Sequence, residues 1–278
     1  MTGGSALRAR AAGVLGCMLL VLGLAAGTTP AAARILKTRR PRENSKPLAL
    51  TMGSGFEYET DGEESEYGFP FLAEYGLTDW LKLGAEPSWI FIRRKAGGQV
   101  SSPGDLETTL TFDLPTERRY RPGLAFESVI KWPTARSRDL GTGKTDYSFG
   151  AILSKEFVRF DLDANAIYTV VGNPEGLSLN NTFEASLASE WHLRPGLDLE
   201  GEFVTAMGAG GRFRGHSGSL GGFANIGGPE QGQSESEFTL GLAESRSEFL
   251  KFEQGVIMKS GGSWQFVIAW EYDFAGGR

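Results

Sequence analysis

Cysteine and histidine are the residue types that this chain of 278 residues has least of. The only cysteine, Cys17, lies in an apolar stretch near the N-terminus, and the two histidines are His192 and His216. A single cysteine excludes a framework of intramolecular disulfides. Two histidines leave few candidates for a general base or a metal ligand, because histidine is the side chain most often used for both.

An excess of basic residues is also missing. The chain has 28 Lys and Arg against 34 Asp and Glu, which gives a net charge of −6 and a pI of about 5.2. Domains that bind nucleic acid carry the opposite balance. We therefore expect no nucleic-acid partner.

Long apolar runs occur only before residue 33. Arg8 and Arg10 precede the apolar stretch 11–26, and Ala31-Ala32-Ala33 then offers small residues to a signal peptidase. This is the pattern of a secretory signal peptide, with cleavage predicted after Ala33. An uncleaved N-terminal anchor is the alternative, but the run is short for a membrane span. Cleavage as a lipoprotein would occur before Cys17, but the most apolar stretch of the signal lies after that position, so we do not expect it.

Removal of residues 1–33 from a chain of 278 leaves 245 residues with no run of 18 apolar residues, so no transmembrane helix is expected. Aromatic residues and glycine are abundant instead, with 18 Phe, 7 Tyr, 6 Trp and 39 Gly in the whole chain. An exported, aromatic-rich chain without a spanning helix is typical of a membrane β-barrel. A soluble periplasmic β-sandwich would fit the composition as well.

Apolar and polar residues alternate along the rest of the chain. In 264–274 the aromatic residues occupy even positions, whereas Gln265, Glu271 and Asp273 occupy odd ones, and 160–170 shows the same pattern. Each such segment is a predicted strand, because successive side chains of a strand point to opposite faces. Twelve segments qualify: 48–59, 67–77, 80–93, 104–114, 121–132, 144–155, 158–171, 179–192, 196–207, 235–245, 247–259 and 263–274.

The number of segments and their connections predict a closed barrel. An even number of strands of this length suits a bacterial outer-membrane barrel. We expect an all-β fold, an antiparallel up-and-down transmembrane β-barrel of about 12 strands over residues 48–278, preceded by a short periplasmic segment, 34–47. The tight links are 76–79, 115–119, 194–196 and 245–247, and the longer ones are 60–66, 94–103, 133–143, 172–178 and the glycine-rich 208–234. Short periplasmic turns and longer outer loops alternate in this way.

A barrel assigns roles to the two faces of each strand. Aromatic side chains near strand ends would form the girdle at the membrane–water boundary; they are Trp80, Trp89, Trp132, Trp191, Trp264, Tyr272 and Phe274. Carboxylates dominate the polar face. The expected lumen-lining residues are Glu57, Glu74, Asp105, Glu107, Asp113, Glu127, Asp146, Asp161, Asp163, Glu184, Glu190, Asp198, Glu200, Glu202, Glu237, Glu271 and Asp273.

Two states of this interior fit the sequence. A water-filled acidic lumen would favour cations, as rings of Asp and Glu do in cation pores. In a closed interior the carboxylates would instead pair with loop arginines, for which Arg93, Arg94, Arg136 and Arg138 are candidates. A closed lumen would favour a structural or adhesive role with 208–234 as the contact.

Several short stretches resemble a known family. They are Gly76-Leu77-Thr78-Asp79-Trp80-Leu81, Gly104-Asp105-Leu106-Glu107, Trp132-Pro133-Thr134 with the following Gly141-Thr142-Gly143-Lys144-Thr145-Asp146-Tyr147, and Leu162-Asp163-Ala164-Asn165-Ala166-Ile167-Tyr168. In order and spacing they resemble the outer-membrane transporter family named for the meta-pathway of phenol degradation, over about 53–274. The resemblance implies a barrel that passes aromatic or other hydrophobic compounds. Ala135 stands where the family has the glycine of a Pro-Thr-Gly motif. Phe274 is not the last residue, whereas the signal that the barrel-assembly machinery usually reads is a final strand with a terminal aromatic residue.

These observations together predict a pore in the outer membrane of a Gram-negative cell. Outer-membrane lipid, a small-molecule solute and the barrel-assembly machinery are the expected partners, and neither a cofactor nor a metal site is expected. We do not expect an enzyme, since no nucleophile follows a recognisable order around the two histidines. A barrel hydrolase that uses His192 or His216 is the remaining alternative.

Overall fold

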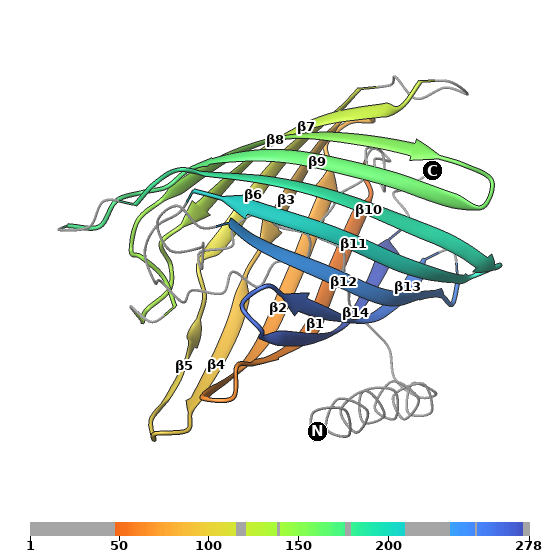
Figure 1. Ribbon diagram of the computed structural model, residues 1–278. Coiled ribbons are helices and arrows are strands. Elements are labelled where there is room, and N and C mark those ends of the chain that lie inside the picture. Colours follow the sequence, from red (N-terminus) through yellow and green to blue (C-terminus); the bar gives the residue numbers. More distant parts are fainter. Residues whose placement is uncertain are drawn as a thin grey trace, which may run out of the picture. The chain divides into compact units, whose positions relative to one another are not determined.

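Strands make up nearly all of the structure (Figure 1). The computed structural model describes residues 48–114, 121–137, 140–175, 179–208, 234–247 and 249–274. Its strands are β1 Leu50–Thr60, β2 Glu64–Gly76, β3 Leu81–Glu86, β4 Ser88–Arg94, β5 Gln99–Pro103, β6 Leu106–Leu114, β7 Gly123–Trp132, β8 Asp146–Glu156, β9 Phe160–Val170, β10 Thr182–Arg194, β11 Leu197–Met207, β12 Ser234–Ser245, β13 Leu250–Lys259 and β14 Trp264–Phe274. Within these residues, no helix has the length and hydropathy to cross a lipid bilayer.

The strands close into one antiparallel ring. β1 pairs with β2 on one side and with β14 on the other, and from β6 onward each strand pairs with its neighbour in the chain. β3 and β4 pair with β2 in a single register on either side of Pro87, so they form one long strand. β5 and β6 continue each other along β4 and β3. The ring therefore has twelve long strands, which confirms the predicted fold class.

Burial follows the alternation that the sequence shows. In β14 the odd-numbered residues from Gln265 to Glu271 are buried, and the aromatic residues between them are more exposed. In β9, Asp161 and Asp163 are buried while Leu162 is exposed. In a closed ring the buried face is the interior, so these strands turn their polar side chains inward and their apolar ones outward.

A β-bulge interrupts this alternation between β5 and β6. The register along β3-β4 shifts by one residue between the pairs Glu86–Glu107 and Trp89–Pro103, which leaves one extra residue on the β5-β6 side, at Gly104-Asp105. A bulge of this kind re-aims the side chains beside it. Ser102 of β5 and Glu107 of β6, which differ in parity, consequently share the buried face, and the adjacent residues Gly104 and Asp105 are both buried.

Some connections differ from the predicted ones. The links expected at 60–66 and 94–103 are tighter, because β2 begins at Glu64 and a strand not foreseen, β5, pairs with β4. Glycines in the left-handed region, Gly62 in the first link and Gly97 and Gly98 in the second, permit these tight turns. The predicted signal peptide, the segment 34–47, and nearly all of the link 208–234 lie outside the described residues.

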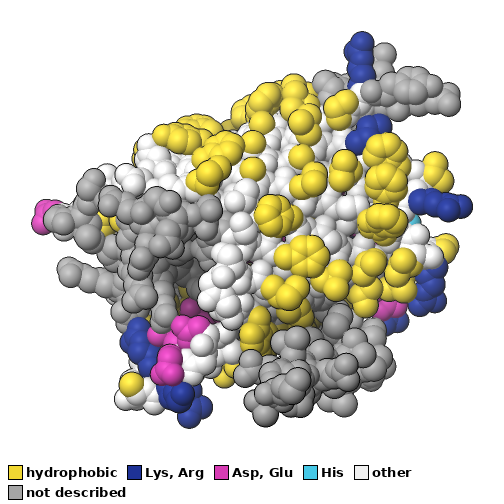
Figure 2. Space-filling view, in the orientation of Figure 1, with side chains coloured by type: hydrophobic (Ala, Val, Ile, Leu, Met, Phe, Trp, Pro, Cys, Tyr) yellow, Lys and Arg dark blue, Asp and Glu magenta, His cyan; other side chains and the backbone are white. Residues whose placement is uncertain are grey.

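The outer face of the ring is apolar (Figure 2). Exposed large side chains include Leu187 in the middle of β10 and Phe203 in β11. Of the residues expected in the aromatic girdle, the following are exposed by 39–55%: Trp80, Trp89, Trp132, Trp191, Trp264 and Phe274, with Tyr272 half-buried. A soluble protein rarely exposes so extensive an apolar surface, whereas a surface in contact with lipid requires it.

Arginine substitutions on this face should depend on depth. Leu187→Arg lies mid-strand and should lower the free energy of unfolding by about 2–4 kcal/mol, since charge at the bilayer midplane is unfavourable. Leu193→Arg, near the end of the same strand, should change it by about 0–1 kcal/mol. Chemical denaturation in lipid vesicles measures both values. Equal losses would contradict contact of this face with lipid.

Candidate functional site

The interior of the ring concentrates acidic side chains. Among the described residues, 17 buried carboxylic acids face only two buried lysines. The buried acids are Glu57, Glu66, Glu86, Asp105, Glu107, Asp113, Glu127, Asp146, Asp161, Asp163, Glu184, Glu190, Glu200, Glu202, Glu237, Glu253 and Glu271. Fourteen of these were predicted from the sequence as lumen-lining.

The other three predicted residues, Glu74, Asp198 and Asp273, are only half-buried, because they lie near the strand ends. Three buried acids were missed: Glu66, Glu86 and Glu253. Each could have been found from alternation alone. Glu66 falls just outside the predicted strand 67–77, and the other two share the parity of Lys82 and Lys251 in their own strands.

Lysines divide the acids into local clusters. Lys82 Nζ lies 3.7 Å from Asp113 Oδ2, and Lys259 Nζ lies 2.9 Å from Glu59 Oε2 and 3.8 Å from Glu237 Oε1. Pairing of this kind offsets part of the desolvation of each buried charge. Among the described residues, the interior thus has four lysines, counting the two described next, beside the 17 buried carboxylic acids.

Lys251, on β13, has the most carboxylate neighbours of the four in the described part of the chain. Its Nζ lies 2.8 Å from Glu253 Oε1, 3.3 Å from Glu200 Oε1 and 3.6 Å from Glu190 Oε2. Side chains from β10, β11 and β13 thus meet at one ammonium group. Among the described residues, one positive charge faces three carboxylates here.

Lys131 forms a second cluster at the other end of the ring. Its side chain is 1% exposed, and its Nζ contacts Asp146 and lies 3.8 Å from Asp105 Oδ2. Asp105 Oδ1 also accepts a hydrogen bond of 2.8 Å from the backbone N–H of Ala135, and Asp146 Oδ1 accepts one of 2.8 Å from that of Gly172. The ammonium group is therefore held together with the two loops that follow β7 and β9.

The loop after β7 folds back over the inner face of the β4–β5 hairpin. Leu140 is buried against Ile90 and Ile92, with Val100 and Ala135 packed beside them. Gly141 leaves room for this return, since a Cβ there would lie 2.7 Å from Asp105 Oδ2 and would displace that carboxylate. The interior thus has an apolar patch beside the Lys131 cluster at the end of the ring that carries the links β4–β5 and β7–β8.

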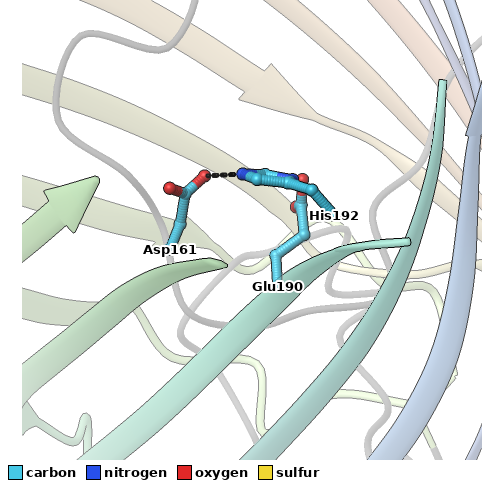
Figure 3. Close-up of side chains that lie close together, drawn as sticks. All are labelled: Asp161, Glu190 and His192. Carbon is cyan, nitrogen blue, oxygen red and sulfur yellow. Dashed lines mark ion pairs between the residues drawn. The ribbon is translucent and has the colours of Figure 1, made fainter. Parts of the chain in front are cut away.

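His192 lies at the opposite end, where the short turns are. Its Nδ1 is 2.9 Å from Asp198 Oδ1, and its Nε2 is 3.5 Å from Asp161 Oδ2, with Glu190 alongside (Figure 3). Alternation predicts these acids in the lumen, but it does not show that they lie beside the histidine. Register was the missing signal: Glu190 pairs with Asp161 across β9 and β10, and His192 pairs with Asp198 across β10 and β11.

This arrangement does not resemble a hydrolytic triad. No serine is among the hydrogen-bond partners of His192 in the part of the chain that the structure describes. The second candidate, His216, lies outside those residues.

Arginines contribute little to the described interior. Arg94 Nε pairs with Glu64 Oε2 at 3.3 Å near the tips of the hairpins, and Arg93 and Arg136 are exposed. Arg138 lies outside the described residues. Of the four candidate arginines, Arg94 thus forms an ion pair with an acid in the described part of the chain.

Solved outer-membrane proteins share this fold. An outer membrane channel from Pseudomonas putida F1 matches with a TM-score of 0.63 at 12% identity, over 89% of this chain and 100% of that one. The NanC porin matches at 0.55 and 9% identity over 80% and 98%, and the KdgM porin at 0.53 and 8% over 80% and 99%. A structure of the KdgM porin in complex with disordered oligogalacturonate matches at 0.51 and 8%, over 80% and 99%. At these identities the likeness establishes the fold alone, which is that of an outer-membrane channel. No protein-family model and no curated protein sequence matches the chain.

Removal of the Lys131 charge should destabilise the ring. Lys131→Met leaves Asp105 and Asp146 buried without their shared cation, and loss of one partner of a buried ion pair costs about 3–5 kcal/mol. The matched control is Lys95→Met, because both side chains of the Lys95–Glu63 pair are exposed. This substitution should lower the free energy of unfolding by less than about 1 kcal/mol. Denaturation in lipid vesicles measures both, and similar losses would show that the Lys131 cluster is as solvated as the surface pair.

Proposed function

We propose that this protein is a channel of the bacterial outer membrane that passes small solutes and favours cations over anions. The observation that carries the proposal is the interior of the closed ring, where the described residues place 17 buried acids beside four lysines. Rings of carboxylates give cation pores their selectivity. An apolar outer face and the fold of outer-membrane channels support the same conclusion.

Water in the lumen follows from the charge balance. An ionised carboxylate that is buried without water or a partner is strongly unfavourable, and the described part of the interior holds 17 buried acids beside four lysines. Ser148 and Thr169, which share a hydrogen bond of 2.8 Å, add further polar groups to the same face. These polar and charged groups favour a lumen filled with water over a dry one.

The location and orientation belong to the same proposal. Residues 1–33 have the pattern of a signal peptide, which would direct the chain out of the cytoplasm. The first residue of β1 pairs with the last residue of β14, on the side of the ring that carries the short turns. We assign this side to the periplasm. The outer-membrane lipid then surrounds the apolar face, and the barrel-assembly machinery inserts it.

The charge of the lumen limits the class of solute. The KdgM porin has been captured with oligogalacturonate, a polyanion, whereas an acidic lumen would repel such a ligand. Neutral and cationic solutes would pass. The resemblance to the family named for the meta-pathway of phenol degradation favours small aromatic compounds, and a phenol, which is neutral near pH 7, is compatible with this lumen.

A catalytic role is not part of the proposal. His192 is oriented by Asp198 as a general base would be, but its other ring nitrogen faces Asp161 and not a nucleophile. If His192→Ala abolished a hydrolytic activity of the purified protein, the alternative of a barrel enzyme would replace this proposal.

Single-channel recording in planar bilayers tests the proposal. The protein should give steady conductance, and unequal salt should give a reversal potential on the cation-selective side, because the lumen is negative. A folded protein without conductance, or one that prefers anions, would contradict the proposal. Heat-modifiable migration on a gel verifies folding in each preparation.

Neutralisation of interior acids should reduce the selectivity. The double variant Glu127→Gln, Glu202→Gln changes two buried positions near the middle of β7 and β11 and should shift the reversal potential toward zero. Glu63→Gln is the control, since this side chain is 79% exposed and lies in the β1–β2 link. An unchanged reversal potential in the double variant would show that the selectivity does not depend on these interior acids.

Uptake by cells that lack general porins tests the solute class. Expression of the channel should accelerate entry of a phenol more than entry of a benzoate of similar size, because the carboxylate is repelled by the acidic lumen. The Glu127→Gln, Glu202→Gln variant should narrow this difference. Faster entry of the benzoate through the unmodified channel would exclude the proposed solute preference.

A further inference from the structure

The His192 cluster has features that the passage of solutes does not require. It consists of Asp161 on β9 and of Glu190 and His192 on β10, and their side chains converge on the inner face at the short-turn end of the ring (Figure 3). One ligand atom from each lies within 4.8 Å of the other two. Among the described residues, this is the one group of three that combines a histidine with carboxylates at this spacing.

We infer that the His192 cluster is a binding site for a divalent transition-metal ion of the Zn²⁺ class. The nitrogen and oxygen ligands of zinc bind at about 2.0–2.1 Å, so two ligands of a tetrahedral ion lie on the order of 3.4 Å apart. His192 Nε2 and Asp161 Oδ2 lie 3.5 Å apart. A metal between them would need almost no rearrangement of either side chain.

Asp198 gives His192 the orientation that a metal ligand needs. His192 Nδ1 is 2.9 Å from Asp198 Oδ1, so Nδ1 carries the hydrogen when the ring is neutral, and the lone pair of Nε2 points toward Asp161. Histidines that bind metals commonly donate their other ring N–H to a carboxylate in this way. Asp198 lies on β11, which makes it a positioning residue contributed by a third strand.

Glu190 can supply the third ligand, because Lys251, one of its partners, has other carboxylates beside it. It pairs with Lys251 at 3.6 Å, but the same ammonium group lies closer to Glu253 and Glu200. Movement of the Glu190 carboxylate toward the metal therefore leaves Lys251 with two carboxylates. Glu190 also has the longest side chain of the three ligands, which suits it to close the remaining distance.

A single histidine distinguishes this site from the general acidity of the lumen. Carboxylates alone would bind Mg²⁺ or Ca²⁺ as readily as other divalent ions, whereas imidazole favours Zn²⁺ and its neighbours in the transition series. Selectivity against Mg²⁺ that depends on His192 is thus the property that identifies the site. The inference needs only the positions of these side chains and does not depend on conduction through the ring.

Isothermal titration of the full-length mature protein with Zn²⁺ tests the inference. The protein should carry no polyhistidine tag, be folded in detergent, and be titrated in an excess of Mg²⁺ that saturates nonspecific carboxylate sites. We expect one Zn²⁺ per chain, with binding lost in His192→Ala. Asp198→Asn should weaken binding by about 10–100-fold, as loss of an outer-shell partner does elsewhere.

His216→Ala is the matched control, because it removes the only other histidine and should leave the titration unchanged. Co²⁺ provides a second readout, since a tetrahedral site with a nitrogen ligand gives an intense visible absorption that should disappear in His192→Ala. Should that variant fail to migrate as a folded barrel, Asp161→Asn replaces it, with loss of the same absorption expected. Zn²⁺ binding that is equally tight without His192, or that is abolished by His216→Ala, would overturn the inference.

Discussion

The closure of the sheet is the constraint on which the rest of the structure depends. Backbone N–H and C=O groups find no partners in lipid, so a sheet that crosses a membrane must have no free edge. The eleven residue pairs between β1 and β14 remove that edge, and they also fix which face of every strand points inward. A slip of one residue in either strand would move Glu57 or Glu271 from the interior to the lipid face. Contact of these charged side chains with lipid would be unfavourable.

Once the face is fixed, the excess of interior acid has consequences along the whole ring. Each of the four lysines is placed among carboxylates, and the Lys131 and Lys251 clusters lie toward opposite ends of the ring. The acidity of the described interior supports both proposals. It would attract cations into the lumen, and at the His192 cluster the same carboxylates would supply ligands to a metal.

The bulge at Gly104-Asp105 shows how a local irregularity builds a site. Without the extra residue, β5 and β6 would keep one parity, and Ser102 and Asp105 could not both face inward. Asp105 lies beside Lys131 and accepts a hydrogen bond from the N–H of Ala135. The loop after β7 is thereby attached to the barrel wall, and Leu140 can cover Ile90 and Ile92.

The sequence by itself determined the class of fold and most of the inner face. Strict alternation over twelve segments is a local property, and burial in β9 and β14 follows it residue by residue. Glu86 and Glu253 follow the same alternation, since both have the parity of the lysine in their own strand. It could not anticipate the short β5 strand, whose pairing with β4 depends on a turn at Gly97-Gly98 and on the bulge.

Only the tertiary structure decided which side chains meet. His192, Asp161 and Asp198 belong to three strands, and their proximity depends on the registers of β9, β10 and β11, which no pattern within one strand specifies. The same holds for Lys251 and Glu190, which are separated by 61 positions in the chain. Alternation fixes a face because it acts between neighbours in sequence, whereas a cluster requires the sheet to be closed and its strands aligned.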